Sequence, residues 1–217
     1  MEIIFHGQSF FEISLKNNDS KQVNIAIDPF GDEIGLKPPK AEADILLLSH
    51  NHKDHSNTDI ISGDYFLIDS LGEFEVKGVL VQGIAAFHDN TQGKDRGSVV
   101  IFKIEAEDIK LCFLSDLGQD ELSSEQIEAI GQVDVLFCPV GGNYTIDAKG
   151  AAHIISQIEP RLVIPMHYFL PDVKAELESV EKFLKQMGDE NPEKTKKLKV
   201  NLKTLSLDET KILVLEP

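Results

Sequence analysis

The stretch from Asp44 to Asn57 reads DILLLSHNHKDHSN and joins an aliphatic run to a cluster of histidines. Its first part, Asp44 to Ser49, has the continuous apolar character of a strand that is buried on both faces. The metal-binding residue types that follow are His50, His52, Asp54 and His55. Side chains two residues apart in extended chain point the same way, so the first two histidines can bind one metal ion. The aspartate and the third histidine then turn toward a neighbouring position.

A cluster of imidazoles with one carboxylate suits zinc or a similar divalent ion of borderline softness. The alternative interpretation is a polar surface loop. Three histidines and an aspartate at this spacing, directly behind a buried strand, favour the metal site.

The composition is that of an ordinary globular protein. The chain has 217 residues, of which 41% are hydrophobic and 27% charged, and this length usually forms one domain. We therefore expect a single domain over residues 1–217. The longest aliphatic stretch, Ile45 to Leu48, is far shorter than the ~18 residues of a membrane-spanning helix. No basic segment precedes the apolar residues at the N-terminus, so we expect neither a secretory signal nor a membrane anchor.

The charge and the cysteines predict the partners and the compartment. A formal net charge of −16 repels the phosphate backbone, so we expect no nucleic-acid partner. The lysine-rich stretch Lys194 to Lys199 has no interleaved aromatic residues and is expected to be a solvated loop. Cys112 and Cys138 each lie in an apolar run and are expected to be buried free thiols. This cysteine usage fits the reducing cytoplasm.

Most of the chain is predicted to form strands, with helices mainly in the second half. Strands are expected at Glu2 to His6, Phe10 to Leu15, Val23 to Asp28, Asp44 to Ser49, Tyr65 to Ile68, Val79 to Ile84, Ser98 to Glu105, Lys110 to Ser115, Val133 to Pro139, Leu162 to Pro165 and Lys211 to Leu215. A capping box of Ser123 and Gln126 predicts a helix that ends near Ile130. Asp147 is expected to cap a second helix, and a third is expected from Asp172 to Met187. Two packed sheets with helices outside satisfy this pattern.

The sequence His-x-His-x-Asp-His after a hydrophobic strand resembles the metal-binding motif of the metallo-β-lactamase superfamily. The resemblance implies an α/β (α+β) fold, a four-layer αβ/βα sandwich with a one- or two-metal site at its edge. It also implies three further ligands in the family's order, each after a predicted strand; these are His88, Asp116 and His167. Taken singly, each of the three also has the simpler interpretation of a solvated residue at a strand end.

The resemblance further implies how two divalent ions would be held. The first would be bound by His50, His52 and His88 and the second by Asp54, His55 and His167, with Asp116 bridging both. Zn²⁺ is the expected cofactor, and Mn²⁺, Ni²⁺ or Fe²⁺ also fit these ligand types. A hydroxide held between the ions would attack an ester, lactone or phosphoester of a small molecule. Asp54 and His167 are the candidate catalytic residues, with Asp54 orienting the hydroxide.

Within the superfamily, the chain is most similar to the small metal-dependent hydrolases grouped with bacterial L-ascorbate-6-phosphate lactonase. The shared marks are His6-Gly7-Gln8-Ser9-Phe10, Asp28-Pro29, Ser49-His50, His88-Asp89, Arg96-Gly97, Pro139-Val-Gly-Gly142 leading to Thr145, and Pro165-Met-His167. Ser56-Asn57 stands where the glyoxalase II and β-lactamase groups have a glycine. This difference disfavours thioester and β-lactam substrates.

Loops at the same edge of the sheets supply the candidate substrate contacts, which are His6, Arg96, Gly141, Gly142 and Thr145. The two glycines could bring backbone amides close to an oxyanion, or they form a plain turn. Lys94 and Arg96 could contact a phosphate or carboxylate, or they are ordinary surface charges. His153 lies within a predicted helix and is expected to be structural or exposed.

Other functions of this fold remain open. One is a lipid phosphodiesterase similar to the phospholipase D that releases N-acylethanolamines. A redox di-iron protein would carry glutamate where this chain has His52, together with a flavin domain. A nuclease of the superfamily would carry an inserted domain and a basic surface. A metal-binding scaffold without activity is a further alternative, and relatives in this branch often form homo-oligomers.

Overall fold

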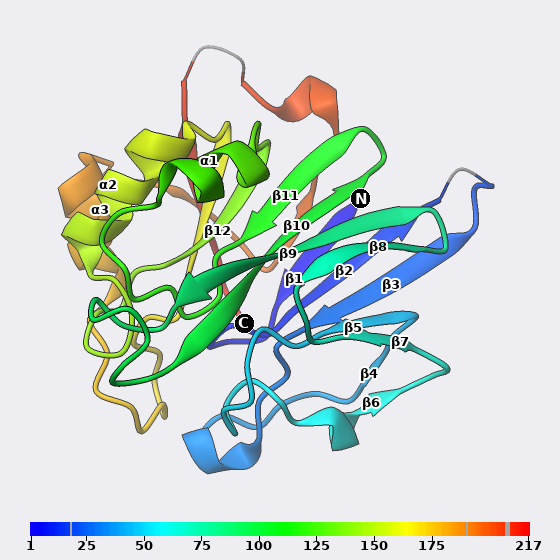
Figure 1. Ribbon diagram of the computed structural model, residues 1–217, viewed down its shortest axis with the longest axis horizontal. Coiled ribbons are helices and arrows are strands. Elements are labelled where there is room, and N and C mark those ends of the chain that lie inside the picture. Colours follow the sequence, from blue (N-terminus) through cyan, green and yellow to red (C-terminus); the bar gives the residue numbers. More distant parts are fainter. Residues whose placement is uncertain (18, 190, 207–208) are drawn as a thin grey trace.

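Two β-sheets packed against each other form the body of the protein in a computed structural model (Figure 1), which describes residues 1–17, 19–189, 191–206 and 209–217. The six-stranded sheet consists, in order, of β15 (Lys197–Lys199), β1 (Glu2–Phe5), β2 (Phe11–Lys16), β3 (Gln22–Ile27), β5 (Ile45–Leu47) and β7 (Phe66–Ile68). The eight-stranded sheet consists of β14 (Glu193–Thr195), β16 (Lys211–Leu215), β13 (Leu162–Met166), β12 (Val135–Pro139), β11 (Ile109–Phe113), β10 (Ser98–Ala106), β9 (Val79–Phe87) and β8 (Gly72–Val76). β4 (Ala41–Glu42) and β6 (Ile61–Ser62) pair separately.

Each sheet combines an antiparallel part with a parallel part. β1, β2 and β3 pair antiparallel, whereas β3, β5 and β7 run parallel. In the larger sheet, β8 to β11 form an antiparallel meander, and β11, β12, β13 and β16 run parallel. The carboxyl ends of parallel strands meet at one edge of a sheet, which is where ligand sites of such sheets lie.

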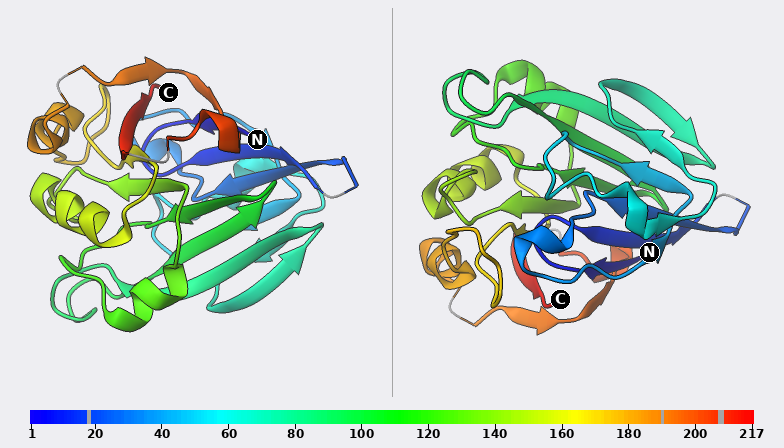
Figure 2. Two further views of the ribbon diagram at one scale, coloured as in Figure 1. Left: turned by 90° about the horizontal axis from the view of Figure 1, so that it is seen from above. Right: turned by 90° about the horizontal axis from the view of Figure 1, so that it is seen from below.

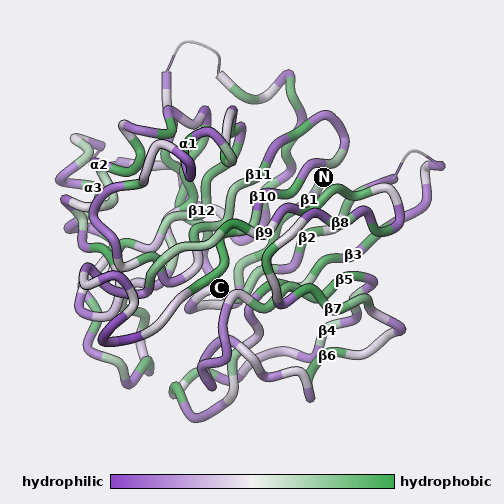
Figure 3. Tube along the Cα trace, viewed as in Figure 1, coloured by the Kyte–Doolittle hydropathy of each residue, from purple (hydrophilic) through white to green (hydrophobic). Residues whose placement is uncertain are grey.

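Aromatic side chains fill the space between the two sheets. The Phe11 ring lies 4.7 Å from that of Phe137, 6.3 Å from that of Phe113 and 4.8 Å from that of Phe5, measured between centroids. All four are buried in one apolar cluster that includes residues of both sheets. The strands are correspondingly hydrophobic and the peripheral loops hydrophilic (Figure 3).

Three α-helices accompany the parallel strands of the larger sheet, and α2 and α3 lie together on one side of the molecule (Figure 2). They are α1 (Ser124–Ile130), α2 (Ala148–Ile158) and α3 (Val180–Met187). Every residue of β12 and β13 is buried, which requires cover on both faces. No helix in the described part of the chain is long and apolar enough to span a membrane.

The predicted caps of the first two helices are confirmed. The Ser123 hydroxyl accepts the Gln126 backbone N–H, and the Gln126 side chain accepts the Ser123 N–H, so both halves of the capping box are present. The Asp147 carboxylate accepts the N–H groups of Lys149 and Gly150. Every predicted strand overlaps an observed one.

The outer face of the six-stranded sheet is covered by loops, 3₁₀ turns and the β4–β6 pair. Phe10, Ala26, Phe30 and Leu46 form a second apolar cluster there, with Ile61 of β6 among its members. The covering segment includes the 3₁₀ turns Asp32–Ile34 and Thr58–Ile60. It connects β3 to β5 and leads from β5 toward β7.

The prediction of a helix from Asp172 to Met187 is wrong for its first half, because only Val180–Met187 is helical. The backbone N–H of Lys174 donates to the Ile34 carbonyl, and that of Glu178 donates to the loop after β12. These backbone groups therefore bond to other loops rather than to carbonyls one helical turn earlier. The apolar residues in this half contact the core from an irregular segment. Periodicity alone does not distinguish such a segment from a helix.

The lysine-rich stretch from Lys194 to Lys199 was expected to be a solvated loop, and this is wrong for its backbone. Most of it forms the strands β14 and β15, at the edges of the two sheets. Its lysine side chains are exposed as expected, and lysine on an edge strand discourages pairing with other chains. The edge strand β8 was not predicted, although Phe74 and Val76 alternate with Glu73 and Glu75; this alternation covers only one short segment.

Both cysteines are free and buried, as predicted. Burial raises the pKa of the Cys112 thiol to about 12 and also raises that of Cys138.

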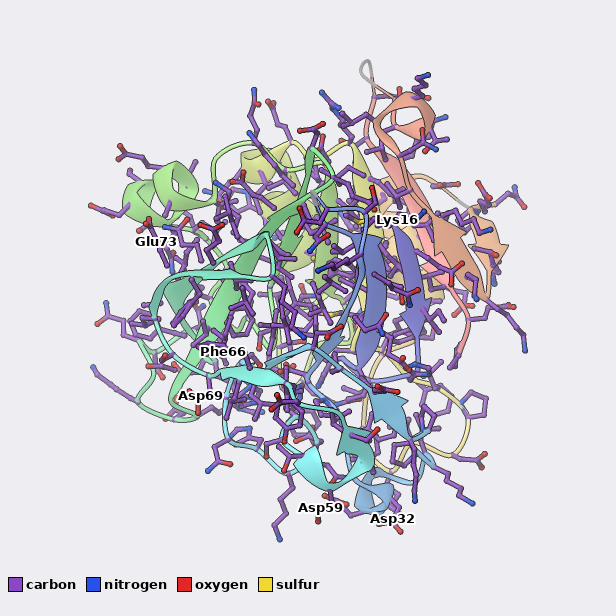
Figure 4. The ribbon with its side chains drawn as sticks, turned by 90° about the vertical axis from the view of Figure 1, so that its right-hand side faces the viewer. Lys16, Asp32, Asp59, Phe66, Asp69 and Glu73 are labelled. Carbon is purple, nitrogen blue, oxygen red and sulfur yellow. The ribbon has the colours of Figure 1, made fainter. Side chains whose placement is uncertain are left out.

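Phe11→Ala is expected to lower the free energy of unfolding by about 3–5 kcal/mol, because it removes a fully buried ring between the sheets. Urea denaturation followed by circular dichroism measures the change. Phe66→Ala is the matched control, since this ring on β7 is 50% exposed (Figure 4), and its effect is expected to be about 0.5 kcal/mol. Equal losses in the two variants would contradict the packing described.

Candidate metal centre

Residues from four separate segments converge where strands of the two sheets end. The segments follow β5, β9, β11 and β13. The first contributes from the six-stranded sheet and the other three from the eight-stranded sheet. The converging side chains are His50, His52, Asp54, His55, His88, Asp116 and His167.

One group consists of His50, His52 and His88, each of which offers one ring nitrogen, and these atoms all lie within 4.8 Å of one another. His50 Nε2 and His52 Nδ1 are 3.1 Å apart. The His88 ring centroid lies 5.1 Å from those of both other histidines. This is the set of residues that the sequence analysis predicts for the first ion.

A second group consists of Asp54, His55, Asp116 and His167, again with donor atoms within 4.8 Å of one another. Asp116 Oδ2 lies 3.2 Å from His55 Nε2 and 3.3 Å from His167 Nε2. It also lies 3.5 Å from His88 Nε2, a member of the first group. Asp116 Oδ2 therefore lies within 3.5 Å of ring nitrogens from both groups.

The donor set fits divalent cations. Two ligand atoms that are ~2.1 Å from one tetrahedral ion lie about 3.4 Å apart, and the donor pairs described above are separated by 3.1–3.5 Å. Asp116 Oδ1 is buried and has no hydrogen-bond partner among the described residues. A buried carboxylate oxygen normally has one, so a cation would supply the missing interaction.

The surroundings of His50 and Asp116 favour the protonation states that metal binding requires, whereas those of His55 favour its charged form. Burial, and then the charge of nearby His55, lowers the pKa of His50 to about 3, so its imidazole is neutral at neutral pH. Burial opposes ionisation of Asp116, but His167 and His55 outweigh it and hold the pKa of this carboxyl well below its usual range. Burial also opposes the charge on His55, but Asp116 foremost raises its pKa. A bound cation would replace that proton.

Asp28 contacts residues of the centre without belonging to either predicted ligand group. The sequence analysis assigned it no role in the site. Its Oδ2 atom lies 3.1 Å from His55 Nδ1 and accepts the Ser49 hydroxyl, while Oδ1 accepts the Ser49 N–H. Burial raises the pKa of Asp28, against these hydrogen bonds. The Ser49 hydroxyl also lies 2.9 Å from His50 Nδ1. Such contacts fix which ring nitrogen faces a metal. The signal in the sequence was the Asp28-Pro29 pair directly after a buried strand.

Gln8 is a second residue that sequence reasoning missed. Its side-chain amide N–H donates to Asp54 Oδ2 at 3.1 Å, and its backbone carbonyl accepts the His167 backbone N–H at 2.8 Å. Gln8 and His167 have φ angles of 53° and 51°, in the left-handed region that residues other than glycine adopt uncommonly. Gln8 therefore links the two ends of the second group.

A pocket of about 420 Å³ opens onto the centre. It is lined by Gln8, His52, Asp54, His88, Asp95, Arg96, Asp116, Tyr144, His167 and Ala175. Of the residues predicted to contact substrate, Arg96 lies among these. Tyr144 lies between the predicted contacts Gly142 and Thr145 but was not itself predicted, and Ala175 lies in the segment that was expected to be helical.

The other predicted substrate residues have different surroundings. His6 Nε2 lies 2.6 Å from Glu12 Oε1, and its ring packs on Phe10. The residues that do not line the pocket are His6, Gly141, Gly142 and Thr145. The Gly142 N–H and the Thr145 hydroxyl both donate to the Ile146 carbonyl. A Cβ atom on Gly141 would lie 2.1 Å from the His167 carbonyl oxygen, so this glycine allows the close approach of the loop that carries His167.

Comparison with known proteins places these features in a family. A family model described as a β-lactamase superfamily domain matches residues 2–167. A UPF0173 metal-dependent hydrolase of Thermococcus onnurineus is 29% identical over 217 residues, covering 87% of this chain and 93% of that protein. A UPF0173 protein of Pyrococcus furiosus is 30% identical and covers 77% of this chain and 83% of its own.

A solved structure from Thermotoga maritima covers nearly the whole fold. It is described as a candidate zinc-dependent hydrolase of the metallo-β-lactamase superfamily, and it is 32% identical to this chain. The match has a TM-score of 0.79 and covers 99% of this chain and 97% of that one. It confirms the predicted fold.

Asp28→Asn is expected to weaken metal binding about 10- to 100-fold, because the neutral amide no longer anchors His55. Competition with a chromogenic chelator measures the affinity. Asp69→Asn makes the same change at an exposed position (Figure 4) and is expected to have no effect. Wild-type affinity in the Asp28 variant would show that this carboxylate does not support the centre.

Proposed function

The chain belongs to the β-lactamase superfamily, as a metal-dependent hydrolase, and we propose that it cleaves an ester, lactone or phosphoester of a small molecule. The observation that carries the proposal is the convergence of two donor groups on one shared carboxylate, Asp116. We assign His50, His52 and His88 to one ion, and Asp54, His55 and His167 to a second. Zinc is the metal proposed, since three imidazoles form the first group.

Divalent ions bound at these positions would supply Lewis acidity and lower the pKa of water toward ~7. The chain itself supplies orientation and charge. Burial opposes ionisation of Asp54, but His55 outweighs it and lowers the pKa of this carboxyl. With Gln8 donating to its Oδ2 atom, the ionised Asp54 can accept a hydrogen bond from the attacking water and so orient it. The His167 ring contributes to orienting Asp116, since its Nε2 atom lies 3.3 Å from Asp116 Oδ2.

The chain's own nucleophilic side chains do not offer a competing mechanism. Both cysteines are buried in the core with raised pKa values, which keeps them as unreactive thiols. Three serines are next to proposed ligands. Ser49 and Ser115 are buried, and the Ser49 hydroxyl donates to Asp28. The third, Ser56, does not line the pocket, and its hydroxyl donates to the His52 carbonyl. Water is therefore the nucleophile that the site can present to a substrate.

The pocket matches a small substrate. Its volume of about 420 Å³ lies at the lower end of the 300–1,000 Å³ typical of small-molecule sites. Except for Ala175, the residues that line it have polar side chains, mainly histidines and aspartates together with Arg96 and Tyr144. This lining favours a polar molecule over a long acyl chain.

His52→Ala and Asp116→Ala are each expected to reduce bound metal and to lower hydrolysis more than about a hundredfold, since losing a ligand exceeds the effect of losing its support. Elemental analysis gives metal equivalents per chain, and chromogenic esters, lactones and phosphodiesters report turnover. His153→Ala is the control, because this histidine is exposed on α2 and should change neither quantity. Full metal content and unchanged turnover in the two ligand variants would refute the assignment.

A further inference from the structure

We propose that the substrate carries an anionic group, a carboxylate or phosphate apart from the bond that is cleaved, and that Arg96 binds this group. The inference rests on the proposed function, because it deepens the description of the same pocket. It follows from how the loop after β9 is built, from the surroundings of the guanidinium and from the charges around the pocket.

The loop that carries Arg96 is fixed by a single carboxylate. Asp89 accepts four backbone N–H groups at 2.8–3.0 Å, those of Thr91, Gly93, Asp95 and Arg96. The loop therefore holds one shape, and Asp89 immediately follows the proposed ligand His88. The position of Arg96 is thus tied to that of the metal centre.

The Arg96 side chain is held without its hydrogen-bonding capacity being used. Its guanidinium carbon lies 4.8 Å from the centre of the Tyr144 ring, a cation–π contact. In the described part of the chain, no ion pair or hydrogen bond of this guanidinium is present. The adjacent carboxylate of Asp95 accepts the Thr91 hydroxyl instead. A stacked guanidinium with free N–H donors is suited to bidentate binding of a carboxylate or phosphate.

The charges of the pocket make this cation distinctive. Arg96 is the one lysine or arginine among the described residues that line the pocket, beside the aspartates Asp54, Asp95 and Asp116. The protein as a whole has a net charge of −16, so its general field repels an anionic ligand. A positive group in the pocket therefore provides local attraction where the surface around it does not.

The reacting group and the anionic group occupy different parts of the pocket. The reacting carbonyl or phosphoryl must lie against the two donor groups, and Arg96 belongs to neither. Arg96 nevertheless lines the same pocket as His88 and Asp116. A substrate that reaches both must carry two polar ends.

A neighbouring residue provides a matched control. Lys94 lies on the same loop and is exposed, but it does not line the pocket. Lys94→Gln and Arg96→Gln remove the same charge from the same loop. A purely general electrostatic effect would appear in both variants, whereas direct binding would appear only in Arg96→Gln.

The test compares two esters of equal length with the metal-loaded protein. Mono-4-nitrophenyl adipate carries a terminal carboxylate, and 4-nitrophenyl hexanoate ends in a methyl group. We expect Arg96→Gln to lower kcat/KM for the adipate ester about tenfold or more, through KM, because a charge-assisted contact is lost. Turnover of the hexanoate ester should stay within about twofold, as should both esters in Lys94→Gln. Equal changes for the two esters, or none, would overturn the proposal.

A binding measurement separates this proposal from the proposed function. Isothermal titration calorimetry of the same proteins uses monomethyl adipate and propyl phosphate as anions, with dimethyl adipate as the neutral control. If the wild-type protein hydrolyses neither ester, binding of either anion that weakens about tenfold in Arg96→Gln alone still supports the anion site. The tighter of the two anions identifies the group. The proposal would be overturned if the wild-type protein bound neither anion, or if Arg96→Gln bound the anions as tightly as the wild-type protein does.

Discussion

The buried carboxylate of Asp116 is the interaction on which the centre depends. It is 2% exposed, and imidazoles of His55, His167 and His88 lie within 3.5 Å of one of its oxygens. An ionised carboxylate at such a position is costly unless positive charge compensates it. The raised pKa of His55 keeps a proton, and therefore positive charge, beside this carboxylate. A bound metal ion would replace that proton, which would couple metal binding to proton release.

The two sheets must hold fixed positions for these groups to meet. His50 to His55 follow a strand of the six-stranded sheet, whereas Asp116 follows a strand of the eight-stranded sheet. The aromatic rings packed on Phe11 set the spacing between the sheets. Beside the centre, the Ser115 hydroxyl donates to the Ser49 hydroxyl at 2.6 Å, and this hydrogen bond joins the sheets directly. Core packing and the geometry of the site are therefore parts of one constraint.

The spacing of the residues from His50 to His55, directly after an apolar strand, predicted a metal site from residue types alone. His88, Asp116 and His167 were expected only because of the resemblance to a known family, and the structure brings them to the same place. The sequence could not predict Asp28 or Gln8 as supporting residues, since their roles depend on contacts with residues far away in the chain. The first half of the expected third helix failed for a related reason: its apolar spacing is helical, but its backbone bonds to distant loops. The loops that carry Arg96 and Tyr144 have no periodicity, so only the structure shows that they meet.

Anomalous X-ray diffraction from crystals of the metal-loaded protein tests the central claim most directly. Data collected on both sides of the zinc absorption edge locate each bound ion independently of the protein phases. Two anomalous peaks are predicted, one among His50, His52 and His88 and one among Asp54, His55 and His167, with Asp116 between them. Metal bound elsewhere, or no peak at these residues after loading, would contradict the account.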